Sequence, residues 1–343
     1  MKVFSARVRN AYNDLVKSSI KPMNAGYPAH LYKSPEGYAA LMAWYDRALA
    51  ALPVQLTTYM INTPYGVTHA LIMGEGAEPV VMLQGFGASS PLWKNQFPAL
   101  VPHFRIFALD VPGHPGRSEG RVLSLLDDSY ARWMVSALDA LALESAHLVG
   151  VCLGGWIAMR TAIYAPQRVR SLTMLSPVGL ARFRVFLRSG VPVILNLGRD
   201  VEKPGERLLR MAFAPPRSGL EFDRDVARAL MLVLKYYDIS ALAGFDGARP
   251  ALGDLMTSLK TLNRFIRPEP IATLRQISAP ALLMVGEHEA IFDPRAALRR
   301  AKRGIPHIDA EIVANAGHAA IYDQPDYVNA RLIAFLRAHA PQP

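Results

Sequence analysis

Short apolar runs and amphipathic segments alternate along most of the chain from residue 79 onward. The apolar runs have the length of buried strands, and the segments between them repeat apolar residues at helical spacing. The clearest helix covers residues 127–143, behind an Asp-Asp-Ser start. Strands that alternate with amphipathic helices predict an α/β fold with a largely parallel sheet covered by helices on both faces.

The individual elements follow from the same pattern. The predicted strands cover residues 79–86, 104–113, 146–153, 169–179, 280–287 and 310–317. Besides 127–143, the predicted helices cover residues 90–101, 156–165, 294–305 and 326–340.

Two regions break the rhythm. Residues 1–53 are mostly helical in pattern and precede two strands near 54–60 and 68–74, so they form a predicted N-terminal helical extension. Residues 180–270 contain helical runs that Pro- and Gly-containing stretches interrupt, which indicates a helical cap inserted between two strands. The predicted α/β core therefore comprises residues 54–179 and 271–343.

Composition excludes several classes of protein. The 343 residues are 51% hydrophobic and 19% charged, which is typical of a globular chain with a sizeable core. A single cysteine excludes an internal disulfide and a cysteine-based zinc cluster, and fits a reducing compartment. The first residues lack the apolar core of a signal peptide, and no apolar run is long enough for a transmembrane segment. We expect a soluble, cytoplasmic protein.

The formal net charge of +10 is concentrated in the predicted extension and cap. The arginines there stand singly among apolar residues and form no nucleic-acid-binding motif, so a solvated basic face is the favoured interpretation and no nucleic-acid partner is expected. An acidic carrier protein, a CoA-type substrate or a membrane surface fits the pattern better than DNA.

The stretch GVCLGG, residues 150–155, lies between a predicted strand and a predicted helix. A tight strand-to-helix turn requires small neighbours, and the amides at the start of the following helix favour a thiolate or an oxyanion. Free cysteine is often only a small buried hydrophobe. Between these glycines, however, Cys152 is better interpreted as a catalytic nucleophile.

Four landmarks in order now support a resemblance: QGFGAS after one strand, GVCLGG at the turn, GEHEAIFDP after the penultimate strand, and NAGH after the last. From about residue 54 onward the chain resembles the α/β-hydrolase superfamily. The resemblance implies a catalytic histidine in the NAGH loop, which is His318. His114 belongs to a loop that shapes the sheet edge, and a direct role for it is the less favoured interpretation. The remaining histidines considered are interpreted as structural or as pointing away from the site: His69, His103, His147, His288 and His307.

The same resemblance suggests the other members of the site. The family's acid follows a Gly-x-x-Asp turn, which here places Glu289 where aspartate is more usual, with Asp293 as the alternative acid. The oxyanion hole is expected to consist of the backbone N–H groups of Leu153 and Phe86. Gln84 stands where most relatives have histidine. No cofactor and no metal are expected.

Cysteine at this turn implies an acyl-Cys thioester intermediate. The leading interpretation is a capped hydrolase with a Cys-His-Glu triad that acts on an ester, thioester or lactone carbonyl of a small-molecule acyl substrate, free or linked to CoA or a carrier protein. An acyltransferase that passes the acyl group to a nucleophile other than water is the alternative, and a non-catalytic ligand-binding protein is a more remote one. Oligomeric state and the identity of the acyl group do not follow from the sequence.

Overall fold

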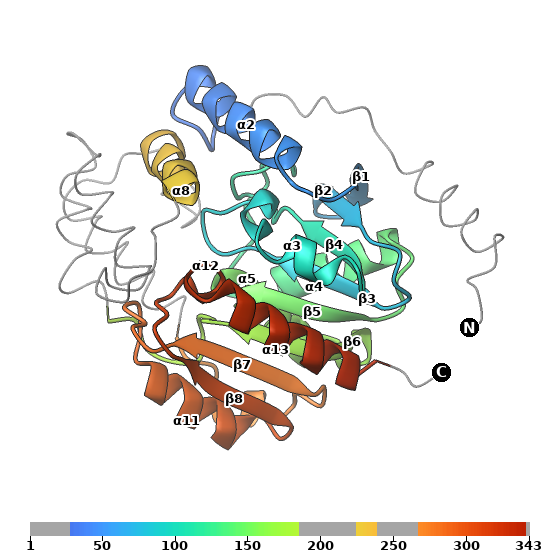
Figure 1. The fold of residues 1–343 in the computed structure, drawn as a ribbon, viewed down its shortest axis with the longest axis vertical. Helices are drawn as coiled ribbons and strands as arrows, with labels where there is room; N and C mark the ends of the chain where they lie inside the picture. The colour runs from blue at the N-terminus through green and yellow to red at the C-terminus, as the bar shows by residue number, and fades with distance from the viewer. Residues whose placement is uncertain (1–27, 185–223, 239–266, 341–343) are drawn as a thin grey trace.

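The computed structural model describes residues 28–184, 224–238 and 267–340 (Figure 1). Within these residues, eight strands form one sheet in the order β1-β2-β4-β3-β5-β6-β7-β8. β1 pairs with β2, and β2 with β4, in antiparallel orientation, whereas every pair from β4 to β8 is parallel. The predicted α/β fold with a mostly parallel sheet is confirmed.

The element bounds are as follows. The strands are β1 (Leu56–Thr63), β2 (Gly66–Met73), β3 (Pro79–Leu83), β4 (Arg105–Leu109), β5 (Ala146–Val151), β6 (Val169–Leu175), β7 (Ala281–Gly286) and β8 (Ile308–Val313). The α-helices are α2 (Pro35–Ala50), α3 (Phe97–Leu100), α4 (Ser129–Ala140), α5 (Leu153–Tyr164), α8 (Arg224–Tyr236), α10 (Ile271–Leu274), α11 (Pro294–Gly304), α12 (Ala320–Asp323) and α13 (Pro325–Ala338). Two 3₁₀ turns are η1 (Ser90–Trp93) and η2 (Pro166–Arg168).

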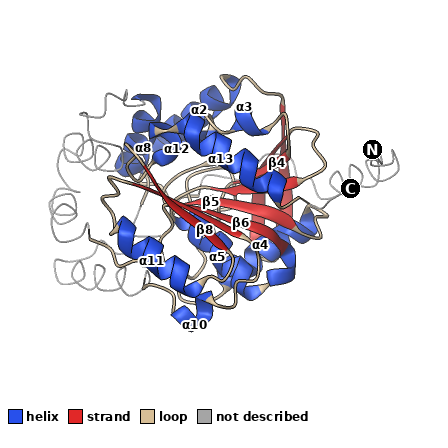
Figure 2. Cartoon of the chain, turned by 60° about the horizontal axis from the view of Figure 1, so that its bottom comes forward, coloured by secondary structure: helices blue, strands red, loops and turns tan. Residues whose placement is uncertain are grey.

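Helices cover both faces of the sheet, as Figure 2 shows. Side chains alternate along each strand, so Val81 of β3 packs into the core that α4, α5 and α11 cover, and Val80 into the core that α3 and α13 cover. Trp133 and Trp93 are the largest fully buried side chains of these two cores. Burial on both faces explains why the parallel strands read as nearly continuous apolar runs.

All six strands predicted from residue 79 onward end earlier than expected. The runs 79–86, 104–113, 146–153, 169–179 and 280–287 stop at Leu83, Leu109, Val151, Leu175 and Gly286, and the run 310–317 spans Ile308–Val313. The residues beyond each end leave the sheet at its carboxyl edge, where parallel strands place their functional loops. These loops contain the candidate site.

One predicted helix is wrong in extent. The segment 90–101 forms η1 and α3 as two separate short pieces rather than one helix. Pro98 removes a backbone donor that a continuous helix would need, and it occupies the first turn of α3, where that donor is not needed. The break also lets the Gln96 side chain donate to the Ile321 carbonyl at 2.9 Å.

The predicted extension and cap lie largely outside the described residues, namely at 1–27, 185–223 and 239–266. Their described parts, α2 and α8, pack against each other. Lys33 N donates to Tyr236 O at 2.8 Å and Asp238 N to Leu31 O at 2.7 Å, so the chain before α2 pairs with the end of α8. The domain boundaries themselves stay predictions. In the described ranges, none of the helices combines the length and the apolar character that crossing a bilayer requires.

Candidate active site

Cys152 occupies the sharp turn between β5 and α5, near the middle of the sheet. Its φ is +53° and its ψ is −114°, a conformation that costs a non-glycine residue about 1–3 kcal/mol. Cys152 N donates to Leu175 O at 2.9 Å, and Cys152 O accepts from Trp156 N at 3.1 Å, so the backbone is held from β6 and from its own helix. The side chain is half-buried. The neighbouring elements thus hold the thiol in a strained, reachable position at the start of a helix.

Glycines around Cys152 allow this turn to close. A Cβ on Gly150 would lie 2.2 Å from Gly154 C, and a Cβ on Gly154 would lie 2.2 Å from Leu83 O. A Cβ on Gly85 would lie 3.2 Å from the Cβ of Cys152, so the loop after β3 runs directly beside the thiol. The backbone contacts at 2.2 Å leave no room for a side chain at Gly150 or Gly154.

His318 lies in the loop between β8 and α12, with 9% of its surface exposed. Its Nδ1 lies 2.8 Å from Glu289 Oε2, and the imidazole interacts electrostatically with the side chain of Cys152. Because Nδ1 contacts the carboxylate, Nε2 is the nitrogen left for Cys152. The structure therefore brings together three predicted residues from the ends of β5, β7 and β8.

The two candidate acids have different surroundings. The Glu289 side chain is fully buried, and its second oxygen, Oε1, accepts from Ile291 N at 2.8 Å. Asp293 instead begins α11, where Oδ1 accepts from Arg295 N at 3.0 Å, and Oδ2 pairs with Arg184 at 2.5 Å. Glu289 contacts the imidazole, while Asp293 caps a helix.

The electrostatics of His318 reflect these partners. Burial alone lowers its pKa, but the Glu289 carboxylate and the Cys152 sulfur more than offset that effect, and the pKa of His318 lies well above its usual value. A histidine that is held in its charged form can stabilise a thiolate beside it.

The expected oxyanion donors lie on the two loops that flank the thiol. Leu153 is the first residue of α5, and Phe86 follows β3 by three positions. Among the described residues, neither backbone N–H donates a hydrogen bond. The side chain of Gln84 is buried, and its hydrogen bonds assign the amide oxygen to the side facing Trp93, where it accepts from Trp93 Nε1 at 2.6 Å. Gln84, which stands where most relatives have histidine, therefore has a tryptophan as its partner.

The remaining histidines do not reach Cys152. His69 and His147 are both buried. His69 contacts Asp110 at 3.2 Å, and His147 contacts Ser171 at 2.7 Å. His103 contacts Arg337, and His288 contacts Glu287. The backbone carbonyl of His307 accepts from Ala281 N. His114 is different, because its Nδ1 accepts from Gly87 N in the oxyanion loop at 3.3 Å.

Two residues near His318 escaped the sequence reasoning. Asp323 is buried and accepts from Gly317 N at 2.7 Å, which holds the loop immediately before His318. Phe292 packs edge-on against the imidazole, with the ring centroids 6.3 Å apart. The only local sign of Asp323 in the sequence is an acid six residues after a loop glycine, and this spacing is too common to predict a contact.

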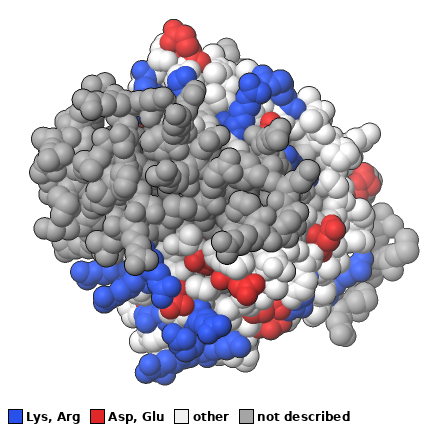
Figure 3. Space-filling model, turned by 60° about the vertical axis from the view of Figure 1, so that its left-hand side comes forward, with Lys and Arg blue, Asp and Glu red and all other residues white. Residues whose placement is uncertain are grey.

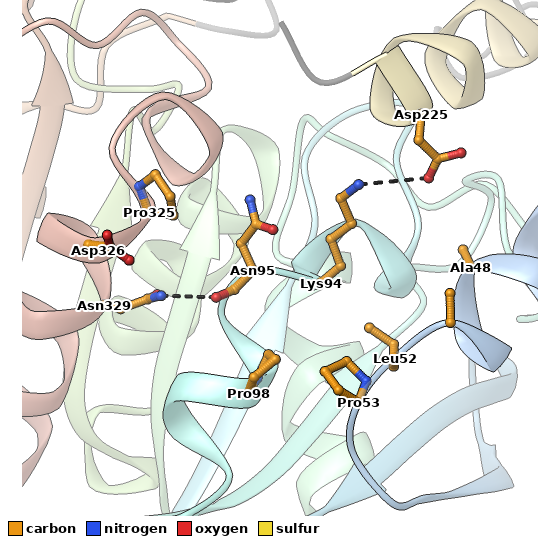
Figure 4. Close-up of a pocket in the computed structure, with 11 residues that line it drawn as sticks. Ala48, Leu52, Pro53, Lys94, Asn95, Pro98, Asp225, Pro325, Asp326 and Asn329 are labelled. Carbon is orange, nitrogen blue, oxygen red and sulfur yellow. Dashed lines mark hydrogen bonds and ion pairs between the residues drawn. The ribbon is translucent and has the colours of Figure 1, made fainter. Parts of the chain in front are cut away.

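A pocket of about 560 Å³ lies elsewhere, between the end of α2, the segment after η1 and the start of α13. Figure 4 shows Lys94 extending toward Asp225, at 3.8 Å, and Asn329 donating to Asn95 O at 2.9 Å. Neither Cys152, Glu289 nor His318 lines this pocket, so it is not the candidate site.

The described residues also bear on metal binding and on the distribution of charge. Across the ranges that the structure describes, no group of three or more His, Cys, Asp or Glu residues could hold a metal ion. On the face shown in Figure 3, Lys and Arg form separate clusters with Asp and Glu between some of them. Most of the predicted extension and cap, to which the interpretation of a solvated basic face applies, lies outside the described residues, so that interpretation stays a prediction.

Comparisons with known proteins identify the family of the chain. Residues 78–325 match the family described as alpha/beta hydrolase fold. The chain belongs to this family. The residues matched run from the first parallel strand to the start of α13 and so include all three members of the candidate triad.

Carboxylesterases are among the similar proteins. The uncharacterized carboxylesterase nap of Bacillus subtilis is 30% identical over 305 residues, covering 86% of this chain and 91% of that one. Carboxylesterase YbfK of the same organism is 31% identical over 85% of this chain and 92% of its own length. The crystal structure of the B. subtilis carboxylesterase CesB (YbfK) superimposes with a TM-score of 0.74 at 27% identity, covering 88% of this chain and 99% of that one. The likeness therefore extends well beyond the motifs, to most of both chains.

Proposed function

We propose that this α/β-hydrolase cleaves the ester bond of a small-molecule substrate through an acyl intermediate on Cys152. The observation that carries the proposal is the arrangement of three residues: Glu289 contacts His318, and His318 interacts electrostatically with Cys152, which lies at the start of α5. The similarity to carboxylesterases supports an ester carbonyl as the group attacked. Most members of the superfamily have serine at this turn, so the thiol is the distinctive element of the proposal.

The acylation step begins with the Cys152 thiolate. Its sulfur attacks the carbonyl carbon, and the carbonyl oxygen becomes an oxyanion that the N–H groups of Phe86 and Leu153 bind. Each such donor is worth about 3 kcal/mol of transition-state stabilisation. His318 then gives its proton to the departing alkoxide, which leaves as an alcohol, and the acyl group stays on sulfur as a thioester.

Deacylation reverses these roles. His318, now neutral, takes a proton from a water molecule, and the resulting hydroxide attacks the thioester carbon. The C–S bond breaks, the carboxylic acid is released, and the imidazolium–thiolate pair is restored. Throughout both steps Glu289 holds the imidazole with Nε2 toward the sulfur.

Mass spectrometry of the intact protein tests this proposal. The enzyme is incubated with a panel of p-nitrophenyl esters and acyl thioesters, the latter to include CoA- and carrier-type substrates. An acyl adduct on Cys152 that decays in buffer alone supports hydrolysis. An adduct that persists until an alcohol or amine acceptor is added rejects hydrolysis and makes the protein an acyltransferase. If no compound of the panel forms an adduct or is turned over, the covalent mechanism is rejected and a ligand-binding role remains.

A further inference from the structure

His114 is a buried histidine that the proposed reaction does not use. It lies in the loop after β4, has 4% of its surface exposed, and donates its backbone N–H to Val111 O at 3.1 Å. Burial lowers the pKa of the imidazole to about 3. The ring is therefore neutral at any pH at which the thiol enzyme can work, and one ring nitrogen always retains a lone pair.

That lone pair is directed at the oxyanion loop. Gly87 N donates to His114 Nδ1 at 3.3 Å, so the ring proton belongs on Nε2. The ring of Phe86 packs edge-on against the same imidazole, with centroids 5.5 Å apart and an interplanar angle of 82°. His114 thus contacts the Phe86–Gly87 segment through both a backbone N–H and a side chain.

These contacts act on the group that the reaction needs. Phe86 is 36% exposed, and its own N–H donates no hydrogen bond within the described residues. Because peptide units are planar, fixing the Gly87 N–H leaves only the two backbone dihedrals of Phe86 between this anchor and the Phe86 N–H. An oxyanion donor is effective only within a few tenths of an ångström of its required position.

The loop of His114 is itself held by the end of α8. The Tyr237 hydroxyl donates to Gly113 O, directly before His114. Tyr237 is fully buried and packs edge-on against Tyr32, with centroids 5.1 Å apart. The anchor of the oxyanion loop is therefore connected to the segments before α2 and after α8, and not only to the sheet.

We propose that His114 is a positioning residue of the oxyanion hole, whose Nδ1 accepts the Gly87 N–H and thereby sets the direction of the Phe86 N–H. It neither gives nor takes a proton in the reaction. The inference rests on the proposed function and deepens it, since it matters only where an oxyanion forms.

The experiment compares two reactions of the same thiol. Ester turnover forms an oxyanion, whereas alkylation of Cys152 by iodoacetamide displaces iodide at a saturated carbon and forms none. His114→Phe keeps a ring but removes the acceptor. We expect its kcat on a p-nitrophenyl ester to fall by about 10- to 100-fold, with its alkylation rate within about twofold of the wild type. His114→Asn places an amide oxygen near the position of Nδ1 and should recover most of the lost kcat.

A matched control comes from the other end of β5. His147 is also fully buried, and its pKa is lowered to about 4 by burial, but it contacts Ser171 far from the loops of the site. His147→Phe should lower the midpoint of thermal unfolding without lowering the kcat of the folded enzyme. If His114→Phe does not fold, His114→Leu replaces it.

Three results would overturn the inference: an unchanged kcat in the acceptor-free variant, a parallel loss of alkylation, or an equal loss of kcat in the His147 control. Failure of the proposed function is distinguishable, because the wild type would then either form no acyl adduct on Cys152 or keep that adduct until an acceptor is added.

Discussion

The pair His318–Glu289 and the pair His69–Asp110 have the same chemistry but different surroundings. Both join an imidazole Nδ1 to a buried carboxylate, at 2.8 Å and 3.2 Å, and both lie beside strands of the same sheet. In the first pair, His318 also interacts with the half-buried thiol of Cys152. Beyond the second, His69 Nε2 is buried and has no hydrogen-bond partner among the described residues. The proposed reaction needs a nucleophile beside the far nitrogen of the histidine, and of these two pairs only the first has one there.

The carboxylates show the same contrast. Asp110 accepts from the Tyr45 hydroxyl at 2.9 Å, from both Ser90 N and Ser90 Oγ, and from Arg117 N at 2.9 Å. Those bonds connect the end of β4 to α2, η1 and the following loop. Glu289 has one backbone donor besides its histidine. The Asp110 pair therefore connects several elements of the fold, while the Glu289 pair has fewer contacts beyond its own loop and His318.

The largest effect is expected at the nucleophile, which only one of the two pairs possesses. Cys152→Ala should lower ester turnover by roughly four to six orders of magnitude, as loss of a triad nucleophile does elsewhere. Because Cys152 is the single cysteine, iodoacetamide should add once to the wild type and not at all to the variant by intact mass. Undiminished turnover by the alanine variant would exclude the mechanism.

The next largest effect on turnover is expected at the two candidate acids, Glu289 and Asp293. Glu289→Gln should reduce kcat by about 10³- to 10⁴-fold, because an amide no longer fixes the imidazole tautomer or stabilises its charge. Asp293→Asn, the matched control, should leave kcat nearly unchanged, since Asp293 caps α11 and pairs with Arg184. Steady-state kinetics of the two variants check this order, and the reverse order would transfer the role to Asp293.

The pH dependence of the thiol sharpens the comparison further. The Glu289 carboxylate is the leading contribution that raises the pKa of His318, so removing its charge should lower that pKa. The imidazolium supports the Cys152 thiolate and is lost as pH rises through the pKa of His318. The alkaline limb of the pH–activity profile should therefore move to lower pH in Glu289→Gln. Single-turnover acylation measured across pH checks the shift, and an unmoved limb would contradict the coupling.

How much of this could be read from the sequence depends on the range of each contact. Cys152 and His318 stand at ends of apolar runs beside glycines, so local pattern and family order predict their loops. The contact between His69 and Asp110 requires β2 and β4 to be neighbours, and the strand order 1-2-4-3 is not visible in any local period.

The same limit applies to the oxyanion loop. The bond between Gly87 and His114 joins residues 27 positions apart on two loops whose apposition results from the pairing of β3 with β4. The periodicity also predicts one helix over η1 and α3, because apolar spacing does not reflect the backbone N–H that Pro98 lacks.

The smallest effect on turnover is expected at the second pair. Asp110→Asn should leave the kcat of the folded enzyme unchanged but destabilise it by about 2–4 kcal/mol, because an amide cannot accept all the hydrogen bonds that the carboxylate receives. Burial by itself raises the pKa of Asp110, but the bonds from His69, Arg117 N and Ser90 N more than offset it and the pKa lies below its usual value.

A depressed pKa fixes the sign of the pH effect on stability. The Asp110 carboxylate stabilises the folded state fully above its ordinary pKa of about 4, and this contribution is lost as pH falls through the lower, folded-state pKa. The stability difference between wild type and Asp110→Asn should therefore be largest near neutral pH and shrink in acid. Urea unfolding at several pH values measures it. A large fall in kcat with no change in unfolding free energy would instead make His69–Asp110 part of the active site, and would end the distinction between the two pairs.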